Sequence, residues 1–207
     1  MKQYEGKMVE FISSKMLTDA AHDLSHILRV VKTAKQLCAA EQAAYEVVVP
    51  AAYLHDCFTF PKNHPKRNQS STYAADMAIE FLSSIDYPEQ YFPNIHHAIV
   101  SHSYSANTPP ETLEAKIVQD ADRLDALGAV GIARCVQVST ALGRTLYSLD
   151  DAFCEQRTPD DKTYTIDHFY IKLLHLASTM NTLSATEEAS KRTQFMKGYL
   201  EQLASEI

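Results

Sequence analysis

Glycine is nearly absent from the first half of the chain, and this gap limits the possible folds more than any other feature. The 207 residues include 5 glycines, and none lies between Gly6 and Gly128. Neither of the glycine-rich loops that cradle phosphate, GxGxxG and GxxxxGK[ST], can be written anywhere in the sequence. Rossmann and P-loop folds therefore lose their main sequence support.

The remaining composition indicates an all-helical protein, since Ala, Leu, Glu and Gln are frequent and prolines lie at the edges of segments. Residues 24–37 have the apolar spacing of an amphipathic helix, with Asp19 or Asp23 as its cap. Residues 43–57 are more uniformly apolar. Their length and alanines favour a buried helix over a strand, with Pro50 at a kink or an early boundary. Further helices are expected at 70–84, 91–103, 113–127, 129–142, 166–180 and 187–207.

The apolar pattern continues across every loop, so we expect one domain over residues 1–207. Residues 144–165 are polar and should be irregular, and loops of that length are often lids or binding flaps.

Charge and cysteine usage narrow the functional class. The net charge of -7 argues against binding to duplex nucleic acid, which needs clustered Lys and Arg. No apolar run approaches the ~18 residues of a membrane span, and residues 1–16 lack the continuous apolar region of a secretory signal. The 4 cysteines contain no CxxC pair. We therefore expect a cytoplasmic protein with reduced thiols and no membrane partner.

Three short segments set ionisable side chains among apolar ones. HDLSHILR puts His22, His26 and Arg29 on one helical face. LHDC ends an apolar segment with the doublet His55 and Asp56, and IVQDADRLD places acids within another helix. Because buried charges need partners, the segments together predict a common partner, and a divalent metal is the simplest one.

Imidazole and carboxylate donors suit Mn, Fe, Co, Ni or Zn better than Ca, and the lack of nearby cysteine pairs argues against a structural zinc site. Two His and two Asp would leave positions for water and substrate. Each segment alone has a plain alternative, such as an exposed helix face, a chance dipeptide or a solvated row of acids. The ordered set H…HD…D on successive helices is much more specific than any one piece.

This ordered set resembles the HD-domain superfamily of metal-dependent phosphohydrolases, and in particular one subgroup of small bacterial HD hydrolases. The resemblance implies an all-α, single-domain helical bundle of the HD-domain type, with the metal in the middle of the helical core. It implies the ligands His26, His55, Asp56 and Asp122, with Asp120 as the alternative for the last position. The segments that carry it are HDLSHILRV, AAYLHDC, KNHPKRNQSS, HHAIVSHSYSA, EAKIVQDADRLDALGAVGIAR and DHFYIKLLHL.

The implied chemistry is hydrolysis of a phosphate ester. Coordination lowers the pKa of a water, which can then attack phosphorus, and Asp56 would both ligate the metal and orient that water. Candidate cations for the phosphoryl oxygens are Arg29 and, in the loop after the doublet, Lys62, Lys66 and Arg67. The alternative for this loop is an ordinary solvated basic stretch. Few apolar anchors are expected to hold it on the core.

Other side chains near these segments have further expected roles. The resemblance suggests that His97 or His102 contacts a second metal or the substrate phosphate, and the alternative is a core or helix-end histidine. His22 has no fixed place in the family pattern, so it is assigned either to support of the ligands or to substrate contact. Cys57 is disfavoured as a nucleophile, because a water already suits the metal set and buried thiols are usually inert.

We therefore expect a metal-dependent phosphohydrolase with Mn, Mg, Co, Ni, Fe or Zn as its cofactor. Its expected partner is a small phosphorylated substrate, namely a nucleotide, either a phosphomonoester or a triphosphate cleaved to monophosphate and pyrophosphate. The alternatives are a non-catalytic nucleotide-sensing module and, as a minor one, an HD-type diiron oxygenase that would take extra ligands from His97 and His102. These residues select neither the base nor the metal, and they leave a homo-oligomer open.

Overall fold

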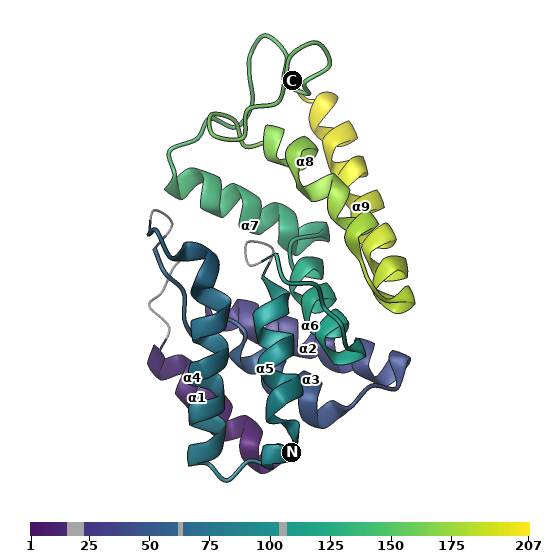
Figure 1. Cartoon of the computed structure of the whole chain (residues 1–207). Coiled ribbons are helices and arrows are strands. Elements are labelled where there is room, and N and C mark those ends of the chain that lie inside the picture. Colours follow the sequence, from purple (N-terminus) through teal and green to yellow (C-terminus); the bar gives the residue numbers. More distant parts are fainter. Residues whose placement is uncertain (16–22, 62–63, 104–106) are drawn as a thin grey trace. The chain divides into compact units, whose positions relative to one another are not determined.

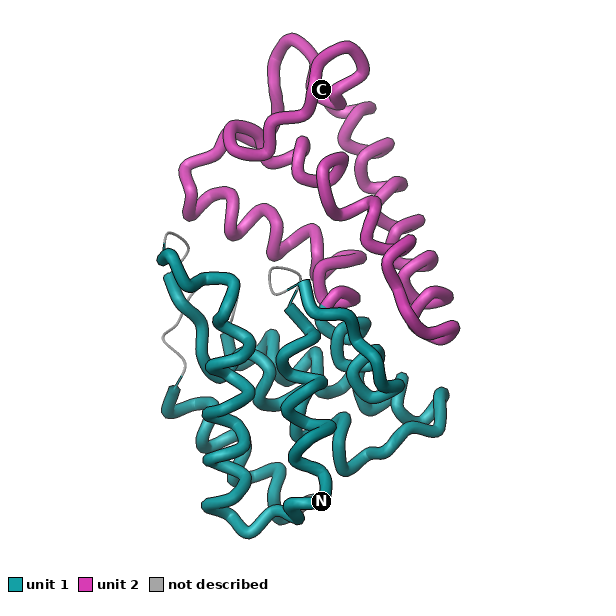
Figure 2. Tube along the Cα trace, in the orientation of Figure 1, with its two compact units in different colours: residues 1–122 teal, residues 123–207 magenta. Residues whose placement is uncertain are grey.

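The computed structural model describes residues 1–15, 23–61, 64–103 and 107–207 (Figure 1). Within these ranges the chain consists of helices and turns, and its β structure is limited to an isolated bridge between Thr145 and Tyr164. This confirms the all-α prediction. The chain divides into two compact units, residues 1–122 and residues 123–207 (Figure 2). The expectation of a single domain stays a prediction.

Unit 1 is organised around a buried helix, α3 (Tyr45–Leu54). Its residues from Val47 to Leu54 are all buried, so the VVV run lies in a helix, as the length and alanines predicted. Helices α1, α2, α4 and α5 all pack against α3. The other elements of the unit are α1 (Lys2–Lys15), α2 (Leu24–Glu41), η1 (Arg67–Gln69), α4 (Ser70–Ser84), η2 (Glu89–Tyr91), α5 (Phe92–His102) and most of α6 (Leu113–Leu124).

Pro50 lies inside α3, and the helix continues past it to Leu54, so of the two expected outcomes, a kink or an early boundary, the boundary is wrong. Proline has no N–H, which removes the helical hydrogen bond to the carbonyl four residues earlier, that of Glu46. The Tyr87 hydroxyl donates to this carbonyl at 2.7 Å. The connection between α4 and α5 thus supplies the donor that the proline removes, and α3 can deliver its last turn to the site.

The first helix, α1, was not expected from the sequence. Met8 and Ile12 are fully buried on its inner face, and the Phe11 ring stacks on Phe81 of α4 with centroids 4.0 Å apart. Glu5 accepts hydrogen bonds from the Lys35 ammonium at 2.5 Å and from the Tyr53 hydroxyl at 3.0 Å. Through Glu5 the helix is tied to α2 and α3.

Unit 2 contains α7 (Gly128–Ala141), α8 (Asp167–Ile171), η4 (Leu173–Thr179) and α9 (Leu183–Ala204). Helix α9 packs against α7 and η4. The helix expected at 166–180 is split into the short α8 and a 3-10 helix, and α9 begins earlier than expected. At Gly131, in the first turn of α7, a Cβ atom would lie 2.2 Å from the Ala126 carbonyl oxygen, so this position requires glycine.

Residues 144–165 are irregular, as expected, but they are held in place by charged hydrogen bonds. The Arg157 guanidinium binds both oxygens of Asp167 at 2.5 and 2.6 Å, and Asp167 is fully buried. The Asp151 carboxylate accepts the backbone N–H groups of residues 155–157 at 2.9–3.0 Å. In the described part of the chain, no helix is both long and apolar enough to cross a membrane.

Candidate metal centre

The position of His26 is set by the cap of α2. Asp23 is the N-cap residue, and its carboxylate accepts the backbone N–H of His26 at 2.8 Å and the Ser25 hydroxyl at 2.8 Å. A side-chain acceptor at this position stabilises the first turn by roughly 1 kcal/mol. Asp23, one of the two expected caps, therefore fixes where the helix begins and places His26 in its first turn. His26 is 1% exposed.

His55 follows the last residue of α3 and is fully buried. Its Nδ1 lies 2.9 Å from the Ala52 carbonyl oxygen, so Nδ1 carries the proton and donates it there. This hydrogen bond leaves Nε2 as the basic nitrogen, which is the form that binds metals. Among the described residues Nε2 of His55 has no hydrogen-bond partner. A buried basic nitrogen without a donor indicates that a ligand is needed there.

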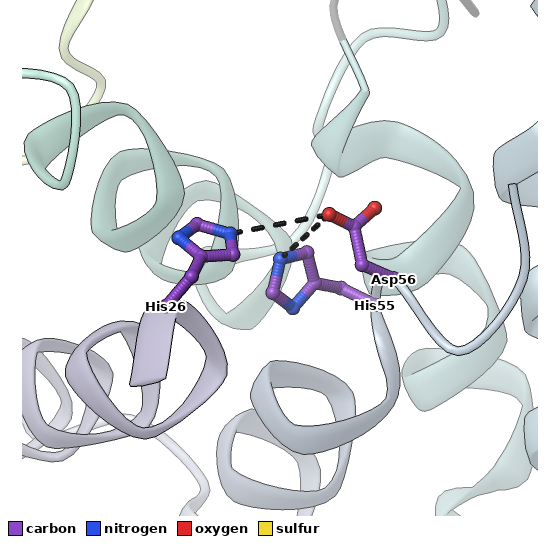
Figure 3. A group of neighbouring side chains, drawn as sticks. All are labelled: His26, His55 and Asp56. Carbon is purple, nitrogen blue, oxygen red and sulfur yellow. Dashed lines mark ion pairs between the residues drawn. The ribbon is translucent and has the colours of Figure 1, made fainter. Parts of the chain in front are cut away.

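Ligand atoms of His26, His55 and Asp56 lie within 4.8 Å of one another (Figure 3). The Asp56 Oδ2 atom is 3.9 Å from Nε2 of His26 and 3.7 Å from Nε2 of His55. Asp122, on α6, brings its Oδ1 atom to 3.4 and 3.9 Å from the same two nitrogens. The structure thus brings together all four side chains of the H…HD…D set.

These separations suit a common ion better than direct hydrogen bonds. Hydrogen bonds between such groups would be about 2.7–2.9 Å long. Two donor atoms that each lie ~2.1 Å from one ion are roughly 3.0–4.2 Å apart, depending on the angle between them. The nitrogen–oxygen distances of 3.4–3.9 Å fall in this interval. The donor set and its spacing fit a divalent metal held by His26, His55, Asp56 and Asp122.

His102, at the end of α5, also belongs to this cluster. It is 7% exposed, and its Nδ1 lies 2.6 Å from the Ile99 carbonyl oxygen. This contact directs Nε2 toward the Oδ1 atom of Asp56 at 3.5 Å, and the ring centroid is 4.8 Å from that of His55. Asp56 therefore faces the imidazoles of His26 and His55 with one oxygen and that of His102 with the other.

Burial and charge set the protonation states of the cluster. Burial lowers the pKa of His55 to about 4, so this imidazole is neutral at pH 7. Burial alone would raise the pKa of Asp122, but the imidazoles of His26, His55 and His102 outweigh it and hold the pKa well below its usual range. For His102 burial acts in the lowering direction, and contact with Asp56 outweighs it and raises the pKa. A neutral His55 and an ionised Asp122 are the forms that metal binding requires.

The choice between Asp120 and Asp122 depends on their helix positions. Residues two apart on a helix point ~200° apart around its axis. Asp122 faces His26 and His55, and Asp120 is fully buried on another side of α6. Asp122 is therefore the acid that the structure brings to the imidazoles.

Two other histidines of α5, His96 and His97, have partners away from this centre. The His97 Nε2 atom accepts the backbone N–H of Glu111 at 3.0 Å, and the His96 Nε2 atom is 3.0 Å from Asp76. Of the pair His97 and His102, only His102 is brought to Asp56 among the described contacts.

The candidate cations are less closely connected with the cluster. Arg29 follows His26 on α2, and its guanidinium donates to the Ser25 hydroxyl at 3.0 Å. Lys66 is exposed, and the Arg67 guanidinium donates to the Phe60 carbonyl in its own loop. His22 and Lys62, which the sequence also offered as contacts, lie outside the described residues.

The loop after the doublet has more apolar anchors than its composition suggested, so that expectation is wrong. The Phe60 ring stacks on His64 at 4.3 Å and meets the edges of Phe58 and Tyr73 at 4.8 and 5.2 Å. The Phe60 backbone N–H also donates to the Ser70 hydroxyl at 3.1 Å. These contacts attach the loop to the beginning of α4.

Cys57, next to Asp56, has the environment of an inert thiol. It is 5% exposed, and its Sγ donates to the Ala74 carbonyl at 3.3 Å. Burial raises the pKa of the thiol to about 12, so it is protonated at neutral pH and is a poor nucleophile. This environment agrees with the preference for a water nucleophile.

The chain is similar to known proteins in sequence and in structure. The HD domain family matches residues 23–127, the segment that contains the whole H…HD…D set. The YpgQ protein of Bacillus subtilis is 32% identical over 198 residues, which are 93% of this chain and 88% of that protein. The crystal structure of Bacillus subtilis YpgQ in complex with ADP has a TM-score of 0.75 at 32% identity and covers 98% of this chain and 94% of that one.

A second solved structure, an HD-superfamily hydrolase from Bacillus thuringiensis, has a TM-score of 0.76 at 32% identity, and the match covers 100% of this chain and 98% of that one. The similarity therefore extends over both units.

Proposed function

Because the chain belongs to the HD-domain family, we propose that it is a metal-dependent phosphohydrolase that acts on a nucleotide through an activated water. The observation that carries the proposal is the arrangement of two buried imidazoles and two carboxylates. Their nitrogen–oxygen distances are 3.4–3.9 Å, which is too long for direct hydrogen bonds. One of these nitrogens, Nε2 of His55, has no hydrogen-bond partner in the described ranges.

His26, His55, Asp56 and Asp122 are the residues that would hold the ion. A divalent ion bound there would lower the pKa of a coordinated water and neutralise charge on the phosphoryl oxygens. The Ala52 carbonyl orients the His55 imidazole, and the Asp23 cap fixes the backbone of the helical turn that carries His26, so both residues are held in place before substrate arrives. The second oxygen of Asp56 faces His102 rather than His26 and His55, which suits it to accept a proton from the attacking water.

Basic side chains would hold the phosphates of the substrate. Arg29 follows His26 by three residues on α2, so both lie on the same side of that helix. Lys66 is exposed in the loop after the doublet, and we assign it, with Lys62 and Arg67, to the phosphates. His102 touches Asp56 and is assigned to substrate or to a second ion. A nucleotide substrate is supported by the complex of the similar YpgQ protein with ADP.

The direct test is an activity panel on the purified protein with Mg, Mn, Co, Ni, Fe and Zn. Nucleoside mono-, di- and triphosphates are offered, and the release of phosphate or pyrophosphate identifies the bond that breaks. We expect turnover with at least one ion and none after chelation. Binding of a nucleotide by calorimetry without turnover would favour the sensing module instead, and oxygen consumption with iron would favour the diiron oxygenase.

The basic loop has its own test. Lys66→Ala should raise KM for a triphosphate more than for a monophosphate, because more phosphates lose a cationic contact. Lys66 is preferable to Arg67 for this purpose, since Arg67 also holds the Phe60 carbonyl. Lys191→Ala, an exposed lysine of α9, is the matched control. An unchanged KM in Lys66→Ala would leave the loop as a solvated basic stretch.

A further inference from the structure

Gln119 is a buried polar residue that the sequence analysis did not single out. It lies on α6, three residues before Asp122, and is 4% exposed. Its Nε2 atom donates to the backbone carbonyl of Ser101 at 2.7 Å. Residues three apart on a helix point to similar sides, so Gln119 and Asp122 both face the region where α5 ends.

The acceptor of this hydrogen bond is one of the carbonyls that a helix end leaves without a helical partner. Helix α5 ends at His102, and the last four carbonyls of a helix lack an N–H from the next turn. Ser101 and Ile99 belong to this group. The Ile99 carbonyl is bound by the His102 ring, and the Ser101 carbonyl is bound by Gln119. The last turn of α5 thus orients the His102 ring through its own Ile99 carbonyl, and α6 holds this turn through Gln119.

Each of the two helices contributes a side chain to the candidate metal centre. Helix α5 supplies His102, which lies 3.5 Å from Asp56. Helix α6 supplies Asp122, which lies 3.4 Å from His26. The hydrogen bond from Gln119 to the Ser101 carbonyl joins α6 to the last turn of α5 and fixes the spacing of the two helices there. A short hydrogen bond from a buried amide is suited to do this, because water cannot compete for it.

From this arrangement we propose that Gln119 is a positioning residue of the metal centre. By binding the end of α5 to α6, it sets the distance between the His102–Asp56 contact and the Asp122–His26 contact. This inference rests on the proposed metal-dependent function. Residues that support metal ligands from behind typically change metal affinity or activity by roughly 10–100-fold when they are replaced.

The test compares two variants that alter the same place. Gln119→Met has a similar shape but no donor. Ser101→Ala removes the buried hydroxyl that donates to the His97 carbonyl, and it keeps the backbone carbonyl that Gln119 binds. General loosening of this turn should appear in both variants, and loss of the link only in Gln119→Met. The wild-type protein, stripped with EDTA and titrated with Mn²⁺ in a calorimeter, gives the reference affinity.

We expect Gln119→Met to bind Mn²⁺ roughly 10–100-fold more weakly than the wild type and Ser101→Ala to bind it nearly as well. The visible spectrum of bound Co²⁺, which reports ligand geometry, should change only in Gln119→Met. In the metal-free protein, backbone amides at the end of α5 should exchange faster with solvent in Gln119→Met. This last measurement tests the link between α5 and α6 without any metal.

Equal Mn²⁺ affinity in Gln119→Met and wild type would overturn the proposal, and so would an equal loss in both variants. If Gln119→Met does not fold, Gln119→Asn, whose amide is one methylene shorter, takes its place. Failure of both to fold would also overturn the proposal, because Gln119 would then be a requirement of the whole fold. If the wild type binds no divalent ion but the amides at the end of α5 still exchange faster in Gln119→Met, the proposed function is contradicted. The structural link between α5 and α6 would then be supported, and the role of Gln119 in a metal centre would be overturned.

Discussion

Each unit has a group of buried ionisable side chains, but the two groups satisfy their polar atoms differently. In unit 2 the buried Asp167 carboxylate has a donor from Arg157 for each oxygen and another from the backbone of Asp160 at 2.5 Å. In unit 1 the buried Nε2 atom of His55 has no hydrogen-bond partner in the described residues, and its nearest carboxylates are 3.7 and 3.9 Å away.

The difference separates a charge cluster that stabilises the fold from one that is arranged for a ligand. Buried polar groups in native proteins are almost always paired, so a pairing completed by the chain itself points to structure. Donor atoms that face one another at distances too long for hydrogen bonds point instead to a ligand from outside the chain. The sequence pointed to the group in unit 1 through the H…HD…D set, and the distances show how differently the two groups are paired.

The largest expected effect comes from removing one carboxylate from each group. Asp56→Ala should lower turnover by more than the roughly 10–100-fold that loss of a supporting residue costs, since it removes a proposed ligand and the proposed base. Asp167→Asn should leave turnover within a few-fold of wild type. Its melting temperature should fall by roughly 10 °C, because one side of a buried charged pair is then left alone.

Initial rates and thermal melts of both variants, measured on the same preparations, check this contrast. The metal-free Asp56→Ala protein should melt at or slightly above the wild-type temperature, since clustered carboxylates repel one another without an ion. A comparable loss of turnover in both variants would remove the distinction between the two groups.

A somewhat smaller effect is expected from metal addition. An ion that binds only the folded protein stabilises it by about 2.7 kcal/mol at 100 times its dissociation constant. For a chain of this size that is a rise in melting temperature of roughly 5–10 °C. Mn²⁺ added to EDTA-treated protein should produce this rise in wild type and in Asp167→Asn, and little of it in His55→Ala. A full rise in His55→Ala would place the ion elsewhere.

The smallest expected effect is a difference in pH dependence. Burial alone would raise the pKa of Asp167, but hydrogen bonds from Arg157 and Asp160 outweigh it and hold the pKa below the usual 3.8. The unfolded chain therefore binds this proton at a higher pH than the folded chain does. The stabilisation is complete above about pH 4 and is lost as the pH falls through the depressed value.

Urea unfolding of metal-free wild type and Asp167→Asn between pH 5 and pH 2.5 measures this dependence. The difference in free energy of unfolding between the two proteins should shrink below about pH 4. A constant difference would show that the Asp167 charge does not contribute. Asp151→Asn is a useful companion, since the pKa of Asp151 is lowered mainly by backbone N–H groups.

Much of the fold could be predicted because its helices follow a simple spacing. Helix α4 has the expected bounds, 70–84, and α2 is capped by one of the two expected residues. Helix α1 was not predicted although Tyr4, Met8 and Ile12 have helical spacing, because the charged residues between them interrupt the apolar pattern. The short α8 and the 3-10 helix after it were not distinguished, since both have the same apolar pattern.

The site was predictable in its residue types, and the family resemblance gave Asp122 as the last member with Asp120 as the alternative. The helical pattern alone does not separate these two acids, and the rotation of α6 turns Asp122 toward the imidazoles. Gln119 carried no signal, because its importance depends on where α5 ends. The anchoring of the loop after the doublet by Phe58 and Phe60 was not predicted, since two prolines and several polar residues surround them in the sequence.

Because of the proline inside α3, the residues allowed at positions 50 and 87 depend on each other as related sequences diverge. Pro50 frees the Glu46 carbonyl, and Tyr87 occupies it, so loss of the Tyr87 hydroxyl is costly only while the proline is present. With alanine at position 50 the backbone N–H returns, and phenylalanine at position 87 becomes nearly neutral. Relatives of this protein should therefore tend to change the two positions together, and a tyrosine at position 87 should accompany a proline in the helix that ends at the His-Asp doublet.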